Sequence, residues 1–157
     1  MSPKKQEEFK VICQNKKARF DYELGERFEA GIVLYGTEVK SLRLGKANLV
    51  DAYAKIENGE AFLVGAHITP YLNAHYGNHD PLRKRKLLLR GQELRKLVGK
   101  VAERGQSLIP LRLYFKNGLA KAELALARGK KQHDKRQTMK EADAKRELSR
   151  AIKDAKS

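Results

Sequence analysis

The chain has 157 residues, of which 41% are hydrophobic, and a formal net charge of +15. One domain of this size buries a substantial core, and the excess of Lys and Arg favours a polyanion such as RNA or DNA as partner. No apolar stretch is long enough for a membrane-spanning helix, and the amino-terminal residues lack the apolar run of a secretory signal. A single cysteine, Cys13, forms no internal disulfide, so we expect a cytoplasmic protein without membrane contact.

Two strands are predicted in the first third of the chain. Residues 9–13 (FKVIC) are rich in apolar side chains, and residues 28–36 are nearly continuous in them. The second pattern is typical of a strand buried on both faces or bent around a barrel. Because Cys13 alternates with apolar neighbours, we expect it to be an inert thiol in the core.

Two dipeptides predict tight hairpins, because Asn and Gly together adopt positive φ at low cost. Each dipeptide is flanked by two runs that are typical of antiparallel strands. The hairpins are residues 50–57 with 60–68 around Asn58-Gly59, and residues 108–115 with 119–127 around Asn117-Gly118.

Residues 69–90, between the first hairpin and the next element, have no regular period. Tyr71 and Tyr76 are interleaved with Asn and Gly and are followed by five cations. Aromatic rings beside cations can stack on exposed bases while the cations hold phosphates. The alternative is a surface loop whose long cations extend into solvent. The cations are Arg83, Lys84, Arg85, Lys86 and Arg90.

His75 and His79 have the spacing of two metal ligands on a helix. Gly77 and Pro81 argue against such a helix, and no pair of cysteines assists. We therefore expect structural or solvent-facing histidines and no metal site.

An amphipathic helix is predicted over residues 91–105, with Gly105 as its carboxyl-terminal stop. Its apolar positions at helical spacing are Leu94, Leu97, Val98 and Val101. Several short strands with one packed helix favour a mainly β fold, a small antiparallel barrel of the oligonucleotide-binding (OB) kind with added helices.

Two parts are predicted along the chain: an RNA-binding barrel over residues 1–127 and a basic tail over residues 128–157. The tail has a net charge of +6 and contains neither proline nor any glycine after Gly129. Its apolar stripe is too narrow and its side chains are too small to dock on the barrel. We expect it to be disordered when free and helical when bound to a polyanion.

Catalysis is not expected from the sequence. It contains no phosphate-binding Gly-rich loop with Lys, no Gly-x-Ser-x-Gly turn and no carboxylate cluster for two metals. Asp134 beside His133 lies in the tail, where no pocket is expected. The residues themselves therefore indicate a basic RNA-binding barrel without enzymatic activity or cofactor.

Three segments carry a specific resemblance to a known family. They are "FEAGIVLYGTEVKSLRLGKANLVDAY" (28–53), "PLRKRKLLL" (81–89) and "RGKKQHDKR" (128–136). In this order they resemble the signature segments of the SsrA-binding protein (small protein B) family, and the likeness extends from residues 15–22 into the tail.

The resemblance implies a fold and a function. Members of that family have an OB-like barrel that binds the tRNA-like domain of transfer-messenger RNA and takes part in trans-translation on stalled ribosomes. The implied partners are this RNA, the ribosome and, indirectly through the RNA complex, elongation factor Tu. The protein would act as a monomer, with its barrel in the place of an anticodon arm.

The resemblance also implies an RNA-facing set of residues. In this set the cations would neutralise phosphates, the amides and the hydroxyl would bond sugars or base edges, and Leu88 would support an unstacked base. The set is Asn15, Lys16, Arg19, Glu29, Gly31, Glu38, Lys40, Ser41, Arg43, Asn48, Leu88 and Lys121.

Two members of the set are carboxylates, which repel phosphate. Glu29 and Glu38 can accept from base amino groups or orient a neighbouring cation such as Lys40. The alternative for both is a solvated charge on the barrel surface.

For the tail, the resemblance implies a helix along ribosomal RNA in the empty messenger channel and decoding centre. Cations would pair with phosphates there, His133 would stack on a base, and Asp134 would cap the helix. The residues matching the tail motif are Gly129, Lys130, Lys131, His133, Asp134, Lys135 and Arg136. The match loosens at Met139 and Ala142.

Two other classes stay open. A general single-stranded-RNA-binding OB-fold protein would bind unstructured RNA as well as a tRNA-like fold. A ribosome-associated structural protein would bind ribosomes without stalling or transfer-messenger RNA.

Overall fold

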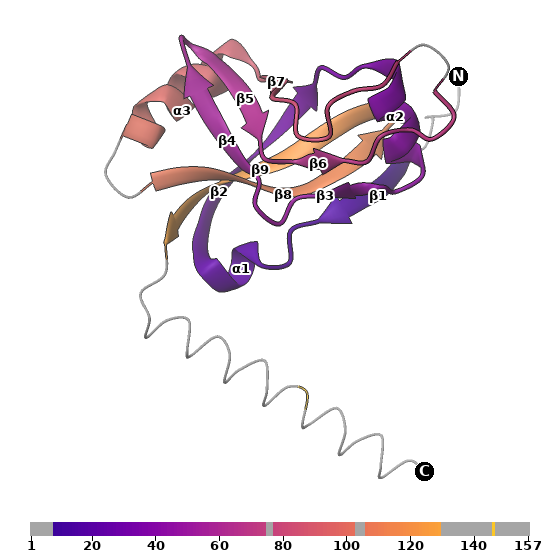
Figure 1. Cartoon of the computed structure of the whole chain (residues 1–157). Helices are drawn as coiled ribbons and strands as arrows, with labels where there is room; N and C mark the ends of the chain where they lie inside the picture. The colour runs from indigo at the N-terminus through magenta and orange to yellow at the C-terminus, as the bar shows by residue number, and fades with distance from the viewer. Residues whose placement is uncertain (1–7, 75–76, 103–105, 130–145, 147–157) are drawn as a thin grey trace, which may run out of the picture.

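The computed structural model describes residues 8–74, 77–102, 106–129 and 146. Within them the chain is mainly β, with three helices (Figure 1). In chain order the elements are β1 (Phe9–Gln14), α1 (Ala18–Asp21), β2 (Tyr22–Ile32), α2 (Gly36–Arg43), β3 (Ala47–Asn48), β4 (Tyr53–Glu57), β5 (Glu60–Val64), β6 (His67–Ile68), β7 (Arg85–Leu88), α3 (Gly91–Ala102), β8 (Gln106–Lys116) and β9 (Leu119–Gly129).

Seven of the strands form one antiparallel sheet in the order β1-β8-β4-β5-β7-β2-β9. Strand β9 also pairs with β8, so the sheet closes on itself and β1 is added at the outside of the ring. Strands β3 and β6 form a separate two-stranded sheet. The predicted barrel is therefore confirmed (Figure 1).

Both predicted hairpins are confirmed at their turns. Asn58 and Gly59 have φ of 52° and 74°, and Asn117 and Gly118 have φ of 51° and 79°. Consecutive positive φ values give a two-residue turn whose twist matches that of the flanking strands. The turn also fixes the register next to it, so that Lys116 lies opposite Leu119 and the same register continues back to Arg112 opposite Glu123. Between Arg112 and Pro110 an irregularity of the β-bulge kind shifts the register by one residue.

Local structure near the amino terminus differs from the prediction. The strand expected over residues 28–36 begins six residues earlier, at Tyr22, and ends at Ile32. Residues Gly36–Arg43 then form α2, which the apolar pattern alone did not predict. The amino end of α2 is held by the Glu38 carboxylate, which accepts a hydrogen bond of 2.8 Å from the backbone N–H of Tyr35.

The core lies inside the barrel. Along β2, Phe28 and Ala30 are buried while Glu29 is exposed, as the two-residue period of a strand requires. Helix α3 adds Leu97, which is fully buried, whereas Val98 is 43% exposed. Cys13 packs against this core, and burial raises the pKa of its thiol to about 11, as expected for an inert side chain.

Strand β9 continues to Gly129, two residues past the predicted end of the barrel. Arg128 and Gly129 lie opposite Glu23 and Tyr22 of β2. Of the predicted tail contacts, Gly129 is described as the last residue of β9. Residues 130–145 and 147–157, and with them the other predicted tail contacts, lie outside the described residues.

We predict that Gly65→Ala destabilises the fold by more than Gly59→Ala. Both glycines have positive φ, which costs an alanine roughly 1 kcal/mol, but an added Cβ at Gly65 would also lie 2.8 Å from the Asp51 carbonyl oxygen. At Gly59 the same Cβ meets no atom within 4 Å. Urea unfolding of the two variants measures the difference, and equal losses would show that the backbone contact at Gly65 is unimportant.

Candidate nucleic-acid interface

A row of residues crosses neighbouring strands on the outer face of the barrel. Gly31 in β2 lies opposite Leu88 in β7 on one side and opposite Lys121 in β9 on the other. Lys121 lies in turn opposite Tyr114 in β8. Because Ala30 is fully buried and side chains alternate along a strand, Gly31, Leu88 and Lys121 lie on the outer face, whereas Tyr114 in the same row is only 2% exposed. The structure thus brings together three members of the predicted RNA-facing set.

Leu88 is 53% exposed, which is unusual for a leucine in a short central strand. A Cβ added at Gly31 would lie 3.4 Å from the Leu88 Cβ, so a larger residue at position 31 would press on this side chain. The glycine therefore leaves room for an apolar surface beside Lys121. Such a surface is suited to an unstacked base.

Glu29 is a charged acceptor at the same face. The Tyr114 hydroxyl donates a hydrogen bond to its carboxylate, and the Lys116 Nζ lies 3.6 Å from the same oxygen. The Tyr114 hydrogen bond is the main cause that lowers the pKa of Glu29, with further contributions from Lys116 and Lys121. Glu29 is thus ionised at neutral pH, and its side chain is 41% exposed. An exposed carboxylate held in this way can accept from base amino groups.

Asn15, Lys16 and Arg19 lie where β1 leads into α1. The Asn15 side-chain amide donates to the Pro110 carbonyl at 3.1 Å, which fixes the start of this turn. All three residues line one groove of about 510 Å³ on the outside of the barrel. They are therefore neighbours in space as well as in sequence.

Lys40, Arg43 and Asn48 form a second group, on α2 and β3, and all three are exposed. The Lys10 Nζ donates to the Arg43 carbonyl at 3.5 Å, which connects this group to β1. The Asn48 Oδ1 accepts from the Val50 N–H at 2.8 Å, so part of the amide is already used within the protein. The members of the predicted set described so far thus lie in three places: the row with Glu29, the groove, and this group on α2 and β3.

Two predicted contacts are corrected by burial. Glu38 is fully buried, and Ser41 is 1% exposed with its hydroxyl donating to the Thr69 carbonyl at 2.6 Å. Neither side chain offers a surface to RNA. Sequence reasoning placed them outside because α2 was not predicted, so the buried side of this segment was not recognised.

Glu38 instead holds two arginines. Its carboxylate accepts hydrogen bonds from Arg83, at 2.5 Å, and from Arg85, whose side chain is fully buried. Arg85 donates further to the carbonyls of Ala66, at 2.8 Å, and Pro81, at 3.2 Å. The alternative of a solvated loop is therefore wrong for Arg85. Lys40, named above as a cation that these carboxylates could orient, is exposed.

Burial by itself raises the pKa of Glu38, but hydrogen bonds from Arg83, the Tyr35 N–H and Arg85 outweigh it. The pKa of Glu38 is therefore lowered, and the group is ionised at neutral pH. Burial also lowers the pKa of Arg85, against the raising effect of Glu38. The pair remains charged because arginine holds its proton throughout the physiological range.

His79 is a structural residue, which was one of the two expectations for the histidines of this segment. It is 6% exposed, and its ring nitrogens contact the Thr37 hydroxyl and the Ile68 carbonyl, each at 2.9 Å. His75 lies outside the described residues. Among the residues that the structure describes, no group of three His, Cys, Asp or Glu side chains could hold a metal ion.

Several cations of residues 69–90 contact aromatic rings within the protein. The Arg83 guanidinium lies 4.1 Å from the Tyr35 ring centroid, and the Lys84 Nζ lies 4.4 Å from that of Phe62. Lys40 lies 5.4 Å from the centroid of Tyr71. These contacts order the cations at the surface and leave Tyr71 beside a member of the predicted set.

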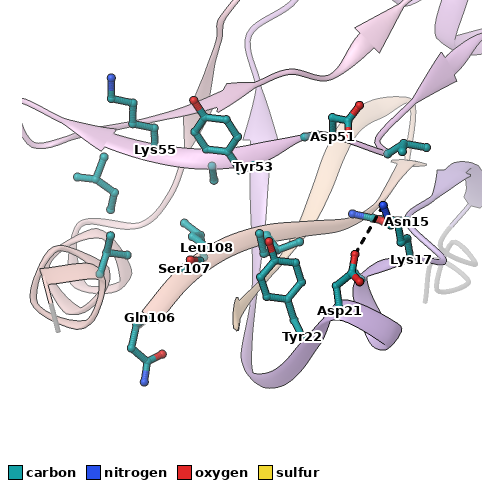
Figure 2. A pocket seen from close by; sticks show the side chains of 17 residues that line it. Asn15, Lys17, Asp21, Tyr22, Asp51, Tyr53, Lys55, Gln106, Ser107 and Leu108 are labelled. Atoms are coloured by element: carbon teal, nitrogen blue, oxygen red, sulfur yellow. Dashed lines mark ion pairs between the residues drawn. The ribbon is translucent and has the colours of Figure 1, made fainter. Parts of the chain in front are cut away.

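A further cleft of about 490 Å³ lies beside α1 (Figure 2). Tyr53 and Lys55 of β4 border it on one side and Tyr22 of β2 on another. At its rim the Lys17 Nζ lies 3.9 Å from Asp21, the ion pair drawn in Figure 2. Its lining mixes rings, amides and paired charges, and Asn15 is the member that it shares with the predicted set.

Sequence reasoning missed Tyr114 and Arg112 of β8. The signal was available, because a two-residue turn at Asn117-Gly118 fixes the β8–β9 register. Counting back from the turn places Tyr114 opposite Lys121 and Arg112 opposite Glu123, as the structure has them. Arg27 of β2 carries no such local signal, because its partner lies 96 residues away.

The sequence matches the family model described as SmpB protein over residues 12–154. The chain belongs to this family. Its relatives named SsrA-binding protein include those of Syntrophobacter fumaroxidans, with 58% identity over 96% of this chain and 94% of the relative, and Geobacter metallireducens, with 59% identity over 92% and 95%. The relative from Thermosynechococcus vestitus is 59% identical over 92% of this chain and 95% of the relative.

The fold agrees with the family assignment. A solved chain from work described as "tmRNA-SmpB: a journey to the center of the bacterial ribosome" is 53% identical and superposes with a TM-score of 0.65. The match covers 76% of this chain and 85% of that chain. The resemblance inferred from the three signature segments is therefore confirmed.

We predict that Glu38→Gln lowers the free energy of unfolding by about 3 kcal/mol at pH 7, because it leaves a buried arginine without its counter-charge. The pKa of Glu38 is lower in the folded state than in the unfolded state. As the pH is lowered below about 4.3, the unfolded state therefore binds the proton more readily, and the free energy of unfolding decreases. The variant should lose this part of the acid dependence.

Chemical denaturation between pH 3 and pH 7, a range of roughly four units around the ordinary glutamate value, measures both effects. Glu57→Gln is the matched control, since Glu57 also forms two ion pairs, with Lys55 and Lys84, but lies at the surface, with a side chain 39% exposed. We expect little change from it. Equal stability of the two variants would contradict a structural role for the Glu38–Arg85 pair.

Proposed function

We propose that this protein binds the tRNA-like domain of transfer-messenger RNA and brings that RNA to stalled ribosomes for trans-translation. The observation that carries the proposal is the family assignment, with relatives named SsrA-binding protein at 58–59% identity over nearly the whole chain. The solved neighbour described as tmRNA-SmpB points to the same RNA and to the ribosome as partners. Any contact with elongation factor Tu would be indirect, through the RNA.

The RNA-facing surface that we infer consists of the members of the predicted set that are not buried. Lys16, Arg19 and Lys121 would neutralise phosphates on the barrel, and Lys40 and Arg43 would do so on α2. This distribution suits a folded RNA, which is recognised through its backbone, its 2′-hydroxyls and splayed bases. Asn15 and Asn48 would bond sugars or base edges, Glu29 a base amino group, and Leu88, beside Gly31, an unstacked base.

Glu38 and Ser41 enter this proposal in a different role from the one expected. Since both are buried, they act on RNA binding by holding α2, which carries Lys40 and Arg43. Buried hydrogen bonds that orient a helix also fix the positions of the cations on the exposed side of that helix. Their loss would weaken binding through misplaced cations.

We further propose a division of labour within the chain. The barrel, which the strand β9 extends to Gly129, would bind the tRNA-like domain. The basic tail that follows would enter the messenger channel and decoding centre of the ribosome when no messenger occupies them. The net charge of +6 over residues 128–157 supports a track of ribosomal RNA as its partner.

We infer that the protein acts by binding and does not catalyse a reaction, and that it needs no cofactor. The family supports an RNA-binding role. No helix among the described residues is long and apolar enough to cross a membrane. A monomer in the cytoplasm, where transfer-messenger RNA and ribosomes meet, fits this role.

A competition experiment tests the RNA specificity. We predict that the tRNA-like domain displaces an unstructured RNA of equal length from the full-length protein at matched salt, because a rigid barrel presents its cations in one fixed geometry. Filter binding measures the two affinities. Equal affinity would reject the proposal in favour of a general single-strand-binding protein.

Truncation after Gly129 tests the division of labour. This variant retains all β2–β9 pairs, so we expect unchanged affinity for the tRNA-like domain but loss of tagging on stalled ribosomes in a reconstituted translation system. Full-length protein is the positive control. Loss of both activities, or retention of tagging, would contradict separate roles for barrel and tail.

A further inference from the structure

The groove that holds Asn15, Lys16 and Arg19 has a second wall that the family resemblance did not assign. Arg27 of β2 and Arg112 of β8 line it together with Glu123 of β9. The groove therefore contains four cations and one carboxylate, in a volume of about 510 Å³. Such an excess of positive charge in a concave surface attracts phosphate groups.

Glu123 binds both arginines at once. Its Oε1 accepts from the Arg27 Nη1 at 3.2 Å, and its Oε2 accepts from the Arg112 Nε at 2.8 Å. The Glu123 side chain is only 15% exposed, while those of Arg27 and Arg112 are 51% and 34% exposed. The carboxylate thus lies beneath the two guanidinium groups, which remain open to the groove.

Arg112 is also held by aromatic rings. Its guanidinium carbon lies 4.9 Å from the ring centroid of Phe9 and 5.0 Å from that of Tyr114. The two rings contact each other, with their centroids 4.7 Å apart. Since the Tyr114 hydroxyl bonds Glu29, this cluster connects the groove to the row of predicted RNA contacts.

A guanidinium has five N–H donors, and Glu123 takes one from each arginine in the part of the chain that the structure describes. The remaining donors form a planar fork that matches the geometry of a phosphate. An arginine already held by a carboxylate loses less side-chain freedom when it binds an anion. The arrangement therefore favours a phosphate ligand over a simple surface ion pair.

We propose that this groove binds the sugar-phosphate backbone of the structured RNA, with Arg27 and Arg112 as phosphate ligands and Glu123 as the positioning residue that holds them. The proposal rests on the proposed function, since it assigns a further subsite to the same RNA-binding face. It extends that face from Lys121 and Glu29 across β8 and β9 to α1.

Glu123→Gln gives a test in which two explanations predict opposite changes in the affinity for the tRNA-like domain. If Glu123 contributes only its negative charge, the variant removes a repulsive group and binds the tRNA-like domain more tightly. If Glu123 positions the arginines, the variant binds it more weakly, by roughly fivefold, because two cations lose their charged acceptor. We expect the weaker binding.

Glu60→Gln is the matched control for net charge. Glu60 lies on β5, outside the groove, and its side chain is 51% exposed with Lys86 at 3.2 Å. This variant gains the same unit of charge and should bind as the wild type does or slightly more tightly. Tighter or unchanged binding by Glu123→Gln would overturn the positioning role.

The arginines are tested by Arg112→Ala and Arg27→Ala, each with Arg95→Ala on α3 as a control that removes one exposed cation elsewhere. Each groove variant should lower affinity by roughly fivefold and reduce the slope of log Kd against log salt by about 1, as loss of one phosphate contact does. Arg112→Lys, which retains charge without the fork, should restore the slope but only part of the affinity.

The two levels of the proposal fail in different ways. If the wild type binds the tRNA-like domain and the unstructured RNA equally, the proposed function fails whatever the groove variants do. If the wild type prefers the tRNA-like domain but the groove variants bind as Arg95→Ala does, the groove is not a phosphate site. Circular dichroism of each variant verifies that the barrel is intact before its affinity is compared.

Discussion

The buried pair of Glu38 and Arg85 is the interaction on which the arrangement of this surface depends. Two charges withdrawn from water are stable together and costly apart, since removing one leaves the other without compensation. The pair joins α2 to β7, and Arg85 also binds the carbonyls of Ala66 and Pro81. It therefore fixes a short helix of eight residues that has little stability by itself. The positions of the exposed Lys40 and Arg43 on this helix therefore depend on the charge of Glu38, which is buried and out of reach of RNA.

Three carboxylates of this basic protein lie at different depths and have charged or hydroxyl partners. Glu38 is fully buried and holds α2, Glu123 is partly buried and holds two arginines, and Glu29 is the most exposed of the three and is held by Tyr114. A negative charge beneath a row of cations reduces their mutual repulsion and fixes their geometry. This explains why a face suited to polyanions contains glutamates, and why their effect depends on what lies between them and the solvent.

The sequence predicted the barrel, both hairpins and α3 because each depends on local signals: strand alternation, a turn dipeptide or helical spacing. It did not predict α2, because the apolar positions there are few and Glu38 is polar, although this residue is among the most buried in the protein. Polar side chains are expected at the surface unless their partner is known. The partner of Glu38 lies 47 residues further along the chain, beyond any local pattern.

By itself, the sequence determined the chemistry of the protein and part of its geometry. The excess of positive charge, the signature segments and the register of β8 against β9 near their turn all follow from neighbouring residues, since a two-residue turn fixes the pairs from Lys116–Leu119 back to Arg112–Glu123. Only the tertiary structure decided which charged side chains face solvent. Barrel closure brings Arg27 of β2 to Glu123 of β9, and the pairing of β7 with β5 and β2 carries Arg85 inside to Glu38. These contacts join distant segments, and their energy is gained only when the whole sheet has closed.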